Sequence, residues 1–149
     1  MTTPLRMSFD VECSAEHAFH VWTSGIGAWW PPDHKASGDS TSVVVLQSGV
    51  GGRIYERTQD GVEHEWGEVT VWEPPARLAY LWHLGRDPAA ATEVDVTFLA
   101  RSSDATRVEI EQRGWEQFGD AAEHWRDRNT FGWQAVIPHY IAVIQDGAS

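Results

Sequence analysis

The sequence has only one cysteine, Cys13, which excludes a disulfide within this chain and favours a reducing compartment. The first residues, MTTPLRMSF, do not contain the apolar run of a signal peptide. Nor does the chain contain a run of about 18 apolar residues, the length that predicts a membrane-spanning helix. We therefore expect a cytoplasmic protein with no membrane insertion.

Cationic residues are also scarce. The 11 lysines and arginines are outnumbered by 22 aspartates and glutamates, which gives a formal net charge of −11. Nucleic acids and anionic membrane surfaces bind proteins through cationic patches. The charge balance therefore argues against both as partners and mainly promotes solubility.

Known catalytic motifs are missing as well. The sequence has neither the Gly-x-Ser-x-Gly turn of serine hydrolases nor a phosphate-binding P-loop. His17 and His20 have the spacing of two metal ligands on a helix, but the HExxH order is absent and no third ligand is evident. Surface or partly buried histidines are the favoured interpretation, and we expect no metal and no cofactor.

Tryptophan, in contrast, is abundant, with nine residues in a chain of 149. A large ring with one N–H group suits both a core and the wall of a ligand site, so most of the nine should fill the core. The length is typical of one domain, and no repeat or linker divides the chain, so we expect a single domain over 1–149.

The longest segment with a helical period runs from about Asp120 to Gln145. Residues at three- and four-residue steps share one face of a helix. That face carries Trp125, Asn129, Trp133, Val136, Ile137, Tyr140, Ile141 and Ile144. At about 1.5 Å per residue the segment makes a rod of roughly 37 Å, long enough to lie across a sheet.

Upstream of this helix, alternating patterns predict seven strands, with two short helices after the first. The strands are expected at 5–12, 43–47, 53–59, 62–73, 77–84, 93–101 and 106–113. Tight turns between consecutive strands, such as Asp60-Gly61, require antiparallel pairing, and a twisted sheet curves. The sequence therefore predicts an α+β helix-grip fold, in which a curved antiparallel sheet wraps around the long C-terminal helix. An apolar cavity is expected between them.

Five segments carry a resemblance to a known family. They are AFHVWTSGIGAWWPP (18–32), GGRIYE (51–56), GEVTVWEPPARLAYLWH (67–83), TRVEIEQRGW (106–115) and FGWQAVIPHYI (131–141). In this order they resemble the START-like (SRPBCC) superfamily, in its branch of homologues of the activator of the heat-shock-protein-ninety ATPase. The resemblance implies the helix-grip fold, a deep cavity and usually no assigned catalytic residues. The chain departs from similar sequences at Gln112, where a histidine is common.

The expected ligand site combines aromatic walls with two amides. Asn129 interrupts the apolar face of the long helix, and Gln112 faces the interior by alternation with Val108 and Ile110. Either amide orients a ligand or belongs to a buried network. The aromatic candidates are Trp30, Tyr55, Trp66, Tyr80, Trp82, Trp115, Trp125 and Trp133.

Glu68 is the one candidate for acid–base chemistry. If the face of its strand that carries Trp66 and Trp72 points inward, Glu68 is a buried carboxylate with a raised pKa. The alternative is a solvated glutamate, or one paired with Arg53 or Arg57.

Three functions fit these features. The first is a binding module for a hydrophobic or aromatic small molecule, lipids included, held between the sheet and the helix. The second is an enzyme, such as a cyclase, dehydratase or hydrolase, that acts on an apolar metabolite in the same cavity. The third is a protein-interaction role, for example with a chaperone or in a stress pathway. A monomer or a homodimer fits each of them.

Overall fold

The curved sheet and the long helix predicted from the sequence are present. The computed structural model describes residues 3–39, 41–84 and 86–147, so Met1, Thr2, Ser40, Gly85, Ala148 and Ser149 of the predicted domain lie outside the described residues. One antiparallel sheet has the order β1-β7-β6-β5-β4-β3-β2. Its seven strands are β1 (Leu5–Val11), β2 (Val43–Leu46), β3 (Arg53–Arg57), β4 (Glu63–Glu73), β5 (Arg77–Trp82), β6 (Thr92–Ser102) and β7 (Ala105–Arg113).

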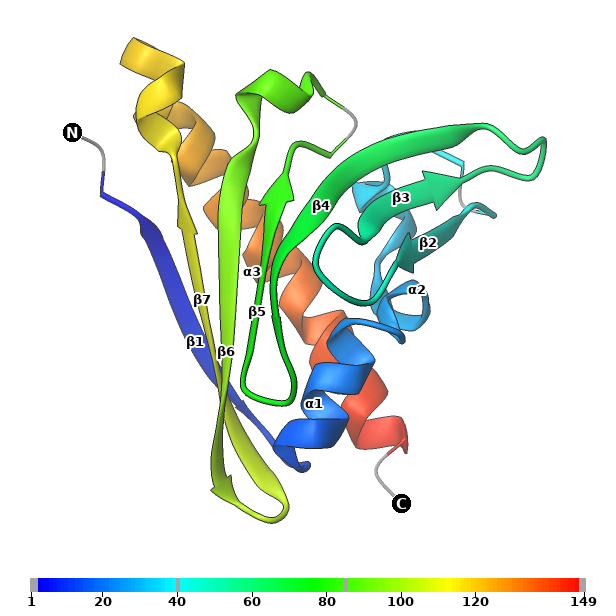
Figure 1. The fold of residues 1–149 in the computed structure, drawn as a ribbon, viewed down its shortest axis with the longest axis vertical. Helices are drawn as coiled ribbons and strands as arrows, with labels where there is room; N and C mark the ends of the chain where they lie inside the picture. The colour runs from blue at the N-terminus through cyan, green and yellow to red at the C-terminus, as the bar shows by residue number, and fades with distance from the viewer. Residues whose placement is uncertain (1–2, 40, 85, 148–149) are drawn as a thin grey trace.

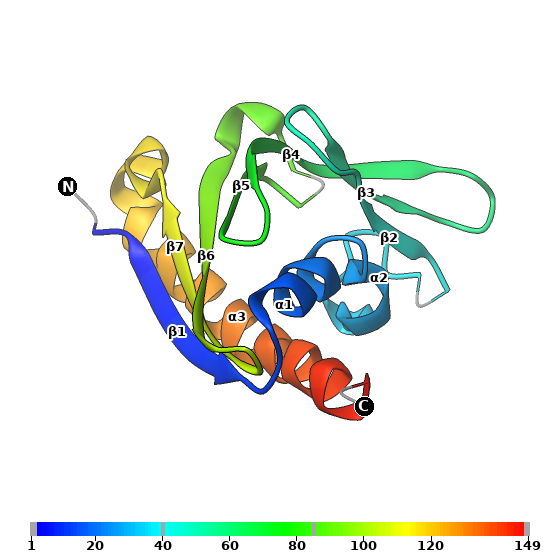
Figure 2. The ribbon, with the colours of Figure 1, turned by 60° about the horizontal axis from the view of Figure 1, so that its bottom comes forward.

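Helices cover the concave face of this sheet (Figures 1 and 2). They are α1 (Ala15–Trp22), α2 (Ile26–Trp29) and α3 (Ala122–Gly147), and the short 3-10 turns are η1 (Pro32–His34), η2 (Pro88–Ala90) and η3 (Trp115–Ala121). The α1 helix begins after Ser14, whose hydroxyl oxygen accepts a hydrogen bond from the His17 N–H at 3.1 Å. The α3 helix crosses the sheet diagonally, and the Tyr140 hydroxyl ties it to α1 by donating to the Ala18 carbonyl at 2.7 Å.

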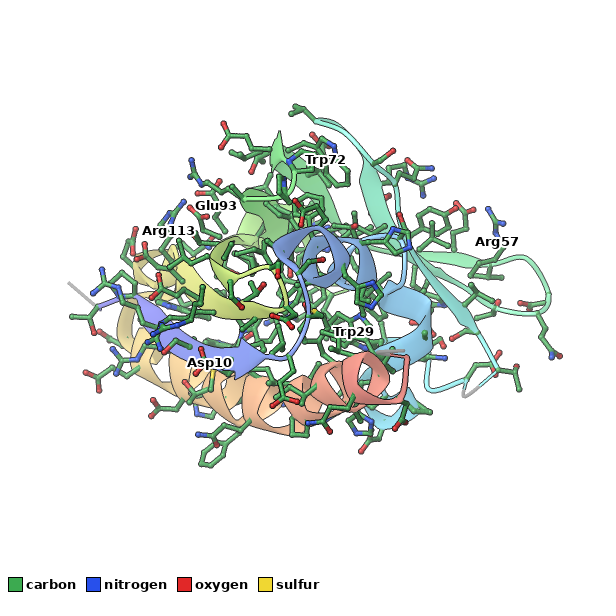
Figure 3. All side chains as sticks on the ribbon, turned by 90° about the horizontal axis from the view of Figure 1, so that it is seen from below. Asp10, Trp29, Arg57, Trp72, Glu93 and Arg113 are labelled. Carbon is green, nitrogen blue, oxygen red and sulfur yellow. The ribbon has the colours of Figure 1, made fainter. Side chains whose placement is uncertain are left out.

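The sheet has an apolar inner face and a charged outer face. In β6 and β7 alternate residues are buried, among them Val94, Val96, Val108 and Ile110. The residues between them carry charges that pair across strands on the outer face, where Glu93 and Arg113 lie (Figure 3). Within the described residues no helix has the length and apolar character of a membrane span.

Strict alternation fails in β4. The strand pairing shifts opposite Ile54 and Tyr55, and again between Val69 and Val71, which marks two β-bulges. Trp66 and Gly67 are therefore both buried, whereas Glu68 is exposed. Of the alternatives for Glu68, the buried carboxylate is wrong and the solvated glutamate is confirmed, because a bulge separates the face of Trp66 from that of Glu68.

The deep cavity expected beneath the sheet is largely filled by aromatic rings. The ring centroid of Trp22 lies 5.2 Å from that of Trp29, 5.9 Å from that of Trp133 and 5.0 Å from that of Tyr140. Trp30 likewise lies beside the indole rings of Trp29, Trp66 and Trp82. Figure 3 shows Trp29 inside the molecule, between the sheet and α3. These rings occupy the centre of the expected cavity.

Candidate functional site

The remaining space lies where β5 ends beside the middle of α3. A small chamber of about 60 Å³ there adjoins a wider open hollow of about 520 Å³. We call the two together the site hollow. Both parts are lined by His34, Trp82, Leu84, Asn129 and Gly132; the chamber adds Trp30, Trp133 and Val136, and the open part adds Arg86, Trp125, Arg128 and Phe131. The chamber is too small for a metabolite, whereas the open part has the size of a ligand site.

Gly132 is the point at which α3 leaves room. A Cβ atom built on Gly132 meets no atom within 4 Å outside the backbone of its own helix. Any larger residue in this helical position would project into the hollow. Phe131 beside it is 72% exposed and lines the open part of the hollow. Phe131 and Gly132 therefore give the helix side of the hollow an apolar part, next to Arg128 and Asn129.

Asn129 is the oriented amide of the site hollow. Its Nδ2 donates to the Trp125 carbonyl one turn earlier at 2.9 Å, and its Oδ1 accepts from Gln112 Nε2 at 3.3 Å. The same Gln112 Nε2 donates to Thr92 Oγ1 at 2.8 Å, and Gln112 Oε1 accepts from Trp133 Nε1 at 2.8 Å. Gln112 is fully buried in this network, so it fixes Asn129 rather than facing a ligand itself.

The sheet side of the hollow is made by the segment after β5. Leu84 has a φ of 49°, in the left-handed region that side-chain-bearing residues rarely adopt. Its N–H and that of His83 both donate to the Trp66 carbonyl, at 3.1 and 2.8 Å. Such backbone strain needs support from surrounding structure and often occurs at functional sites. Here it turns Leu84 toward α3.

The η1 side of the hollow is held by a buried carboxylate. Glu56 in β3 is completely buried and accepts hydrogen bonds from the Ser37 N–H at 3.1 Å, from the Ser37 hydroxyl, and from the Ser42 hydroxyl at 2.6 Å. Burial alone would raise the pKa of Glu56, but the hydrogen bonds outweigh it and lower that pKa. The segment that follows Trp30 and His34 is thereby fixed to the sheet.

The predicted site residues divide into three groups. Trp30, Trp82, Trp125, Asn129 and Trp133 line the site hollow. Trp66, Tyr80, Gln112 and Trp115 are buried behind it, and burial raises the pKa of Tyr80.

Tyr55 forms the third group, and its predicted place in the cavity wall is wrong. It lies on the outer face between Arg53 and Arg57, whose guanidinium carbons are 4.5 and 5.4 Å from its ring centroid. Its neighbours in β3, Ile54 and Glu56, take the inner positions. The sequence pattern alone does not distinguish an aromatic ring that two arginines cover on the outer face from one that faces the core.

Sequence reasoning missed seven residues of the hollow, namely His34, Leu84, Arg86, Arg128, Phe131, Gly132 and Val136. A usable signal existed for Gly132, because a glycine in mid-helix costs stability and needs a reason. The two arginines were also a signal, since cations are few in this chain. Leu84 gave none, because its backbone conformation depends on the fold.

Hollows also lie on the outer face of the sheet, and the one closest in size has charged walls that are largely paired. This hollow, of about 450 Å³, is lined by Arg6, Asp95, Glu109 and Glu111, among others. Arg6 pairs with Glu111 at 3.0 Å, and Asp95 lies between two arginines. Such a surface satisfies its own charges and offers little apolar contact. Within the described residues, no group of three or more His, Cys, Asp or Glu is placed to hold a metal.

Comparison with known proteins agrees with this fold. The family model described as "Activator of Hsp90 ATPase homolog 1-like protein" matches residues 12–144. Among solved structures, the anthrahydroquino-gamma-pyrone synthase Txn09, determined in complex with SUM, is 36% identical, with 83% of this chain and 84% of that chain covered and a TM-score of 0.60.

Two further structures support the fold. CalC from Micromonospora echinospora, a self-sacrificing resistance protein, is 26% identical over 97% of this chain and 96% of its own, with a TM-score of 0.71. MLL2253 from Mesorhizobium loti is 19% identical over 96% and 97%, with a TM-score of 0.70, and shows the fold alone. No curated protein matches the chain.

Proposed function

Because this chain belongs to the family of activator of Hsp90 ATPase homolog 1-like proteins, in the START-like superfamily, we propose that it binds an aromatic small molecule in the site hollow. The observation that carries the proposal is the wall of the hollow, in which Trp82, Leu84 and Gly132 surround the fixed amide of Asn129. Ligand sites typically combine apolar walls with a few well-placed polar groups.

The affinity would come mainly from apolar burial. A ligand ring system that buries roughly 200 Å², about as much as a large aromatic side chain, gains about 5 kcal/mol at about 25 cal/mol per Å². Association costs reduce this gain. The Asn129 amide, held by Gln112, then orients the ligand without having to be ordered on binding. We expect modest affinity for a bare ring system and higher affinity for one with matching polar groups.

The relatives support an aromatic ligand. The 36% identical protein is by its name a synthase of an anthrahydroquinone–γ-pyrone, whose ring system is aromatic. The same name makes an enzyme acting on such a molecule the second candidate, with His34 as the imidazole that lines the hollow. We prefer binding, because no aspartate or glutamate is among the residues that line the hollow and Glu68 lies on the other face of the sheet.

The cellular setting also stays a proposal. We place the protein in the cytoplasm, as a monomer or a homodimer, and a single buried thiol, Cys13, supports a reducing compartment. A chaperone partner, which the family description suggests, stays a prediction.

Native mass spectrometry of the protein purified from its own host tests the binding function. We expect a small-molecule adduct on the wild-type chain and none on the Gly132→Leu variant, in which the added side chain enters the hollow. The proposal fails if neither protein carries an adduct, or if both carry the same one.

A further inference from the structure

The rim of the site hollow holds two arginines that share one indole ring. The guanidinium carbon of Arg86 lies over the Trp125 ring, 4.4 Å from its centroid, and that of Arg128 lies 5.2 Å from the same centroid. One arginine follows β5 and the other is on α3, so the two come from opposite sides of the hollow. Trp125 thus holds two cations at the mouth rather than presenting a bare ring to a ligand.

These two cations are not neutralised within the protein. Among the described residues, neither Arg86 nor Arg128 lies within 4.0 Å of a carboxylate oxygen. Arg113, in contrast, pairs with Glu93, Asp95 and Glu111. Burial, and then the charge of Arg128, lower the pKa of Arg86. Both side chains are exposed, so in a chain with a net charge of −11 they present a local positive charge at the mouth of the hollow.

Their hydrogen-bond donors are also largely unused. Within the described part of the chain, Arg86 donates from Nε alone, to the His83 carbonyl at 3.2 Å, and Arg128 donates to nothing. A guanidinium that stacks on an aromatic ring keeps the N–H groups of its edge available. Such an edge matches the two oxygens of a carboxylate, sulfonate or phosphate.

The neighbouring walls are apolar. Leu84, Phe131 and Trp82 line the same open part of the hollow as the two arginines. A ligand that satisfies the whole site therefore has an apolar ring system at one end and a negative charge at the other. We propose that the site hollow selects aromatic anions, whose rings contact the apolar walls while Arg86 and Arg128 bind the anionic group. This inference rests on the proposed binding function and adds the chemical class of the ligand.

Two fluorescent probes that differ by one charge test it. 1-Anilinonaphthalene-8-sulfonate and N-phenyl-1-naphthylamine have the same ring system, with and without a sulfonate. We expect the sulfonate probe to bind the wild-type protein roughly tenfold tighter or more, as charge-assisted hydrogen bonds imply. The preference should weaken as salt is raised. The Arg86→Gln/Arg128→Gln double variant should bind both probes about equally.

Three further variants make the outcomes distinct. Arg101→Gln removes an exposed arginine of β6 away from the hollow and should keep the preference. Arg128→Gln alone removes a side chain that donates no hydrogen bond within the described residues, so this variant should fold and lose part of the preference for the sulfonate probe. It provides the test if the double variant does not fold. Gly132→Leu should weaken the binding of both probes.

The inference about charge is overturned if the neutral probe binds as tightly as the sulfonate, or if the preference survives in the double variant. If either result is found and Gly132→Leu still weakens the binding of both probes, only the inference about charge fails and the proposed binding function stands. If Gly132→Leu affects neither probe, the binding function is refuted, and the inference about charge fails with it.

Discussion

Gly132→Leu should make the protein more stable and at the same time prevent ligand binding. Glycine in the interior of a helix is destabilising by about 1 kcal/mol relative to good helix formers such as leucine. Apart from the adjacent residues and the backbone of its own helix, a Cβ atom at Gly132 meets no atom within 4 Å, and the rest of the leucine side chain extends into the hollow, so we expect no clash that offsets this gain. We expect a gain in the free energy of unfolding of about 0.5–1 kcal/mol and a rise in Tm of roughly 1–4 °C.

The binding effect has the opposite sign. The leucine side chain extends from α3 into a chamber of only about 60 Å³ and narrows the open hollow beside it. We expect the affinity for N-phenyl-1-naphthylamine to fall by about tenfold or more, because the ring loses its apolar contacts at about 25 cal/mol per Å². Thermal unfolding and fluorescence titration measure the two effects in the same samples.

Gly132→Ala is the matched control. It gains nearly the same helix stability but adds only one methyl group, so it should bind the probe almost as the wild type does. The reasoning is refuted if Gly132→Leu lowers Tm by several degrees, since the space would then not be empty, or if it raises Tm and binds the probe as well as Gly132→Ala.

Three other substitutions test the surroundings of the hollow. Glu56→Gln should lower the free energy of unfolding by about 1–3 kcal/mol at pH 7. Because the pKa of Glu56 is lowered in the folded protein, the wild type should lose this contribution as pH falls below about 4.3 and through the folded-state pKa. The denaturation curves of the wild type and the variant should therefore converge in acid. Gln112→Leu should lower the free energy of unfolding, measured by chemical denaturation, by about 1–3 kcal/mol, because it leaves the Trp133 indole N–H without an acceptor. It should also weaken probe binding, because Asn129 loses its hydrogen bond from Gln112. Unchanged stability would contradict the network. Glu68→Gln should change stability by no more than about 0.5 kcal/mol and leave probe binding as it is, and a large loss of either would restore an inner-face role for this residue.

The architecture was predictable because it depends on periodicity. Alternation in β6 and β7 and the helical period of α3 each bury an apolar face, and tight turns leave antiparallel pairing as the only choice. The family resemblance pointed to the same arrangement, and the match over residues 12–144 confirms it.

The site was predictable only in part. Asn129, an amide on an apolar helical face, pointed to the hollow, and its partner Gln112 was found by alternation. The orientation of Glu68, which the alternation left open, is decided by a β-bulge that inserts one residue. Gly67, a glycine inside this strand, was a signal for such a bulge. The open volume of the expected cavity was not predictable, because whether indole rings fill a space depends on their packing and not on their number.

The central claim is that a ligand binds beside α3 at the end of β5, and not on the outer face of the sheet. Titration of ¹⁵N-labelled protein with N-phenyl-1-naphthylamine, followed by NMR, tests this directly. We predict that the backbone amide signals of Leu84 and Gly132 and the side-chain amide of Asn129 shift together with one dissociation constant. Shifts centred instead on Ser8 and Glu109 of the outer face, or no shifts at all, would contradict it.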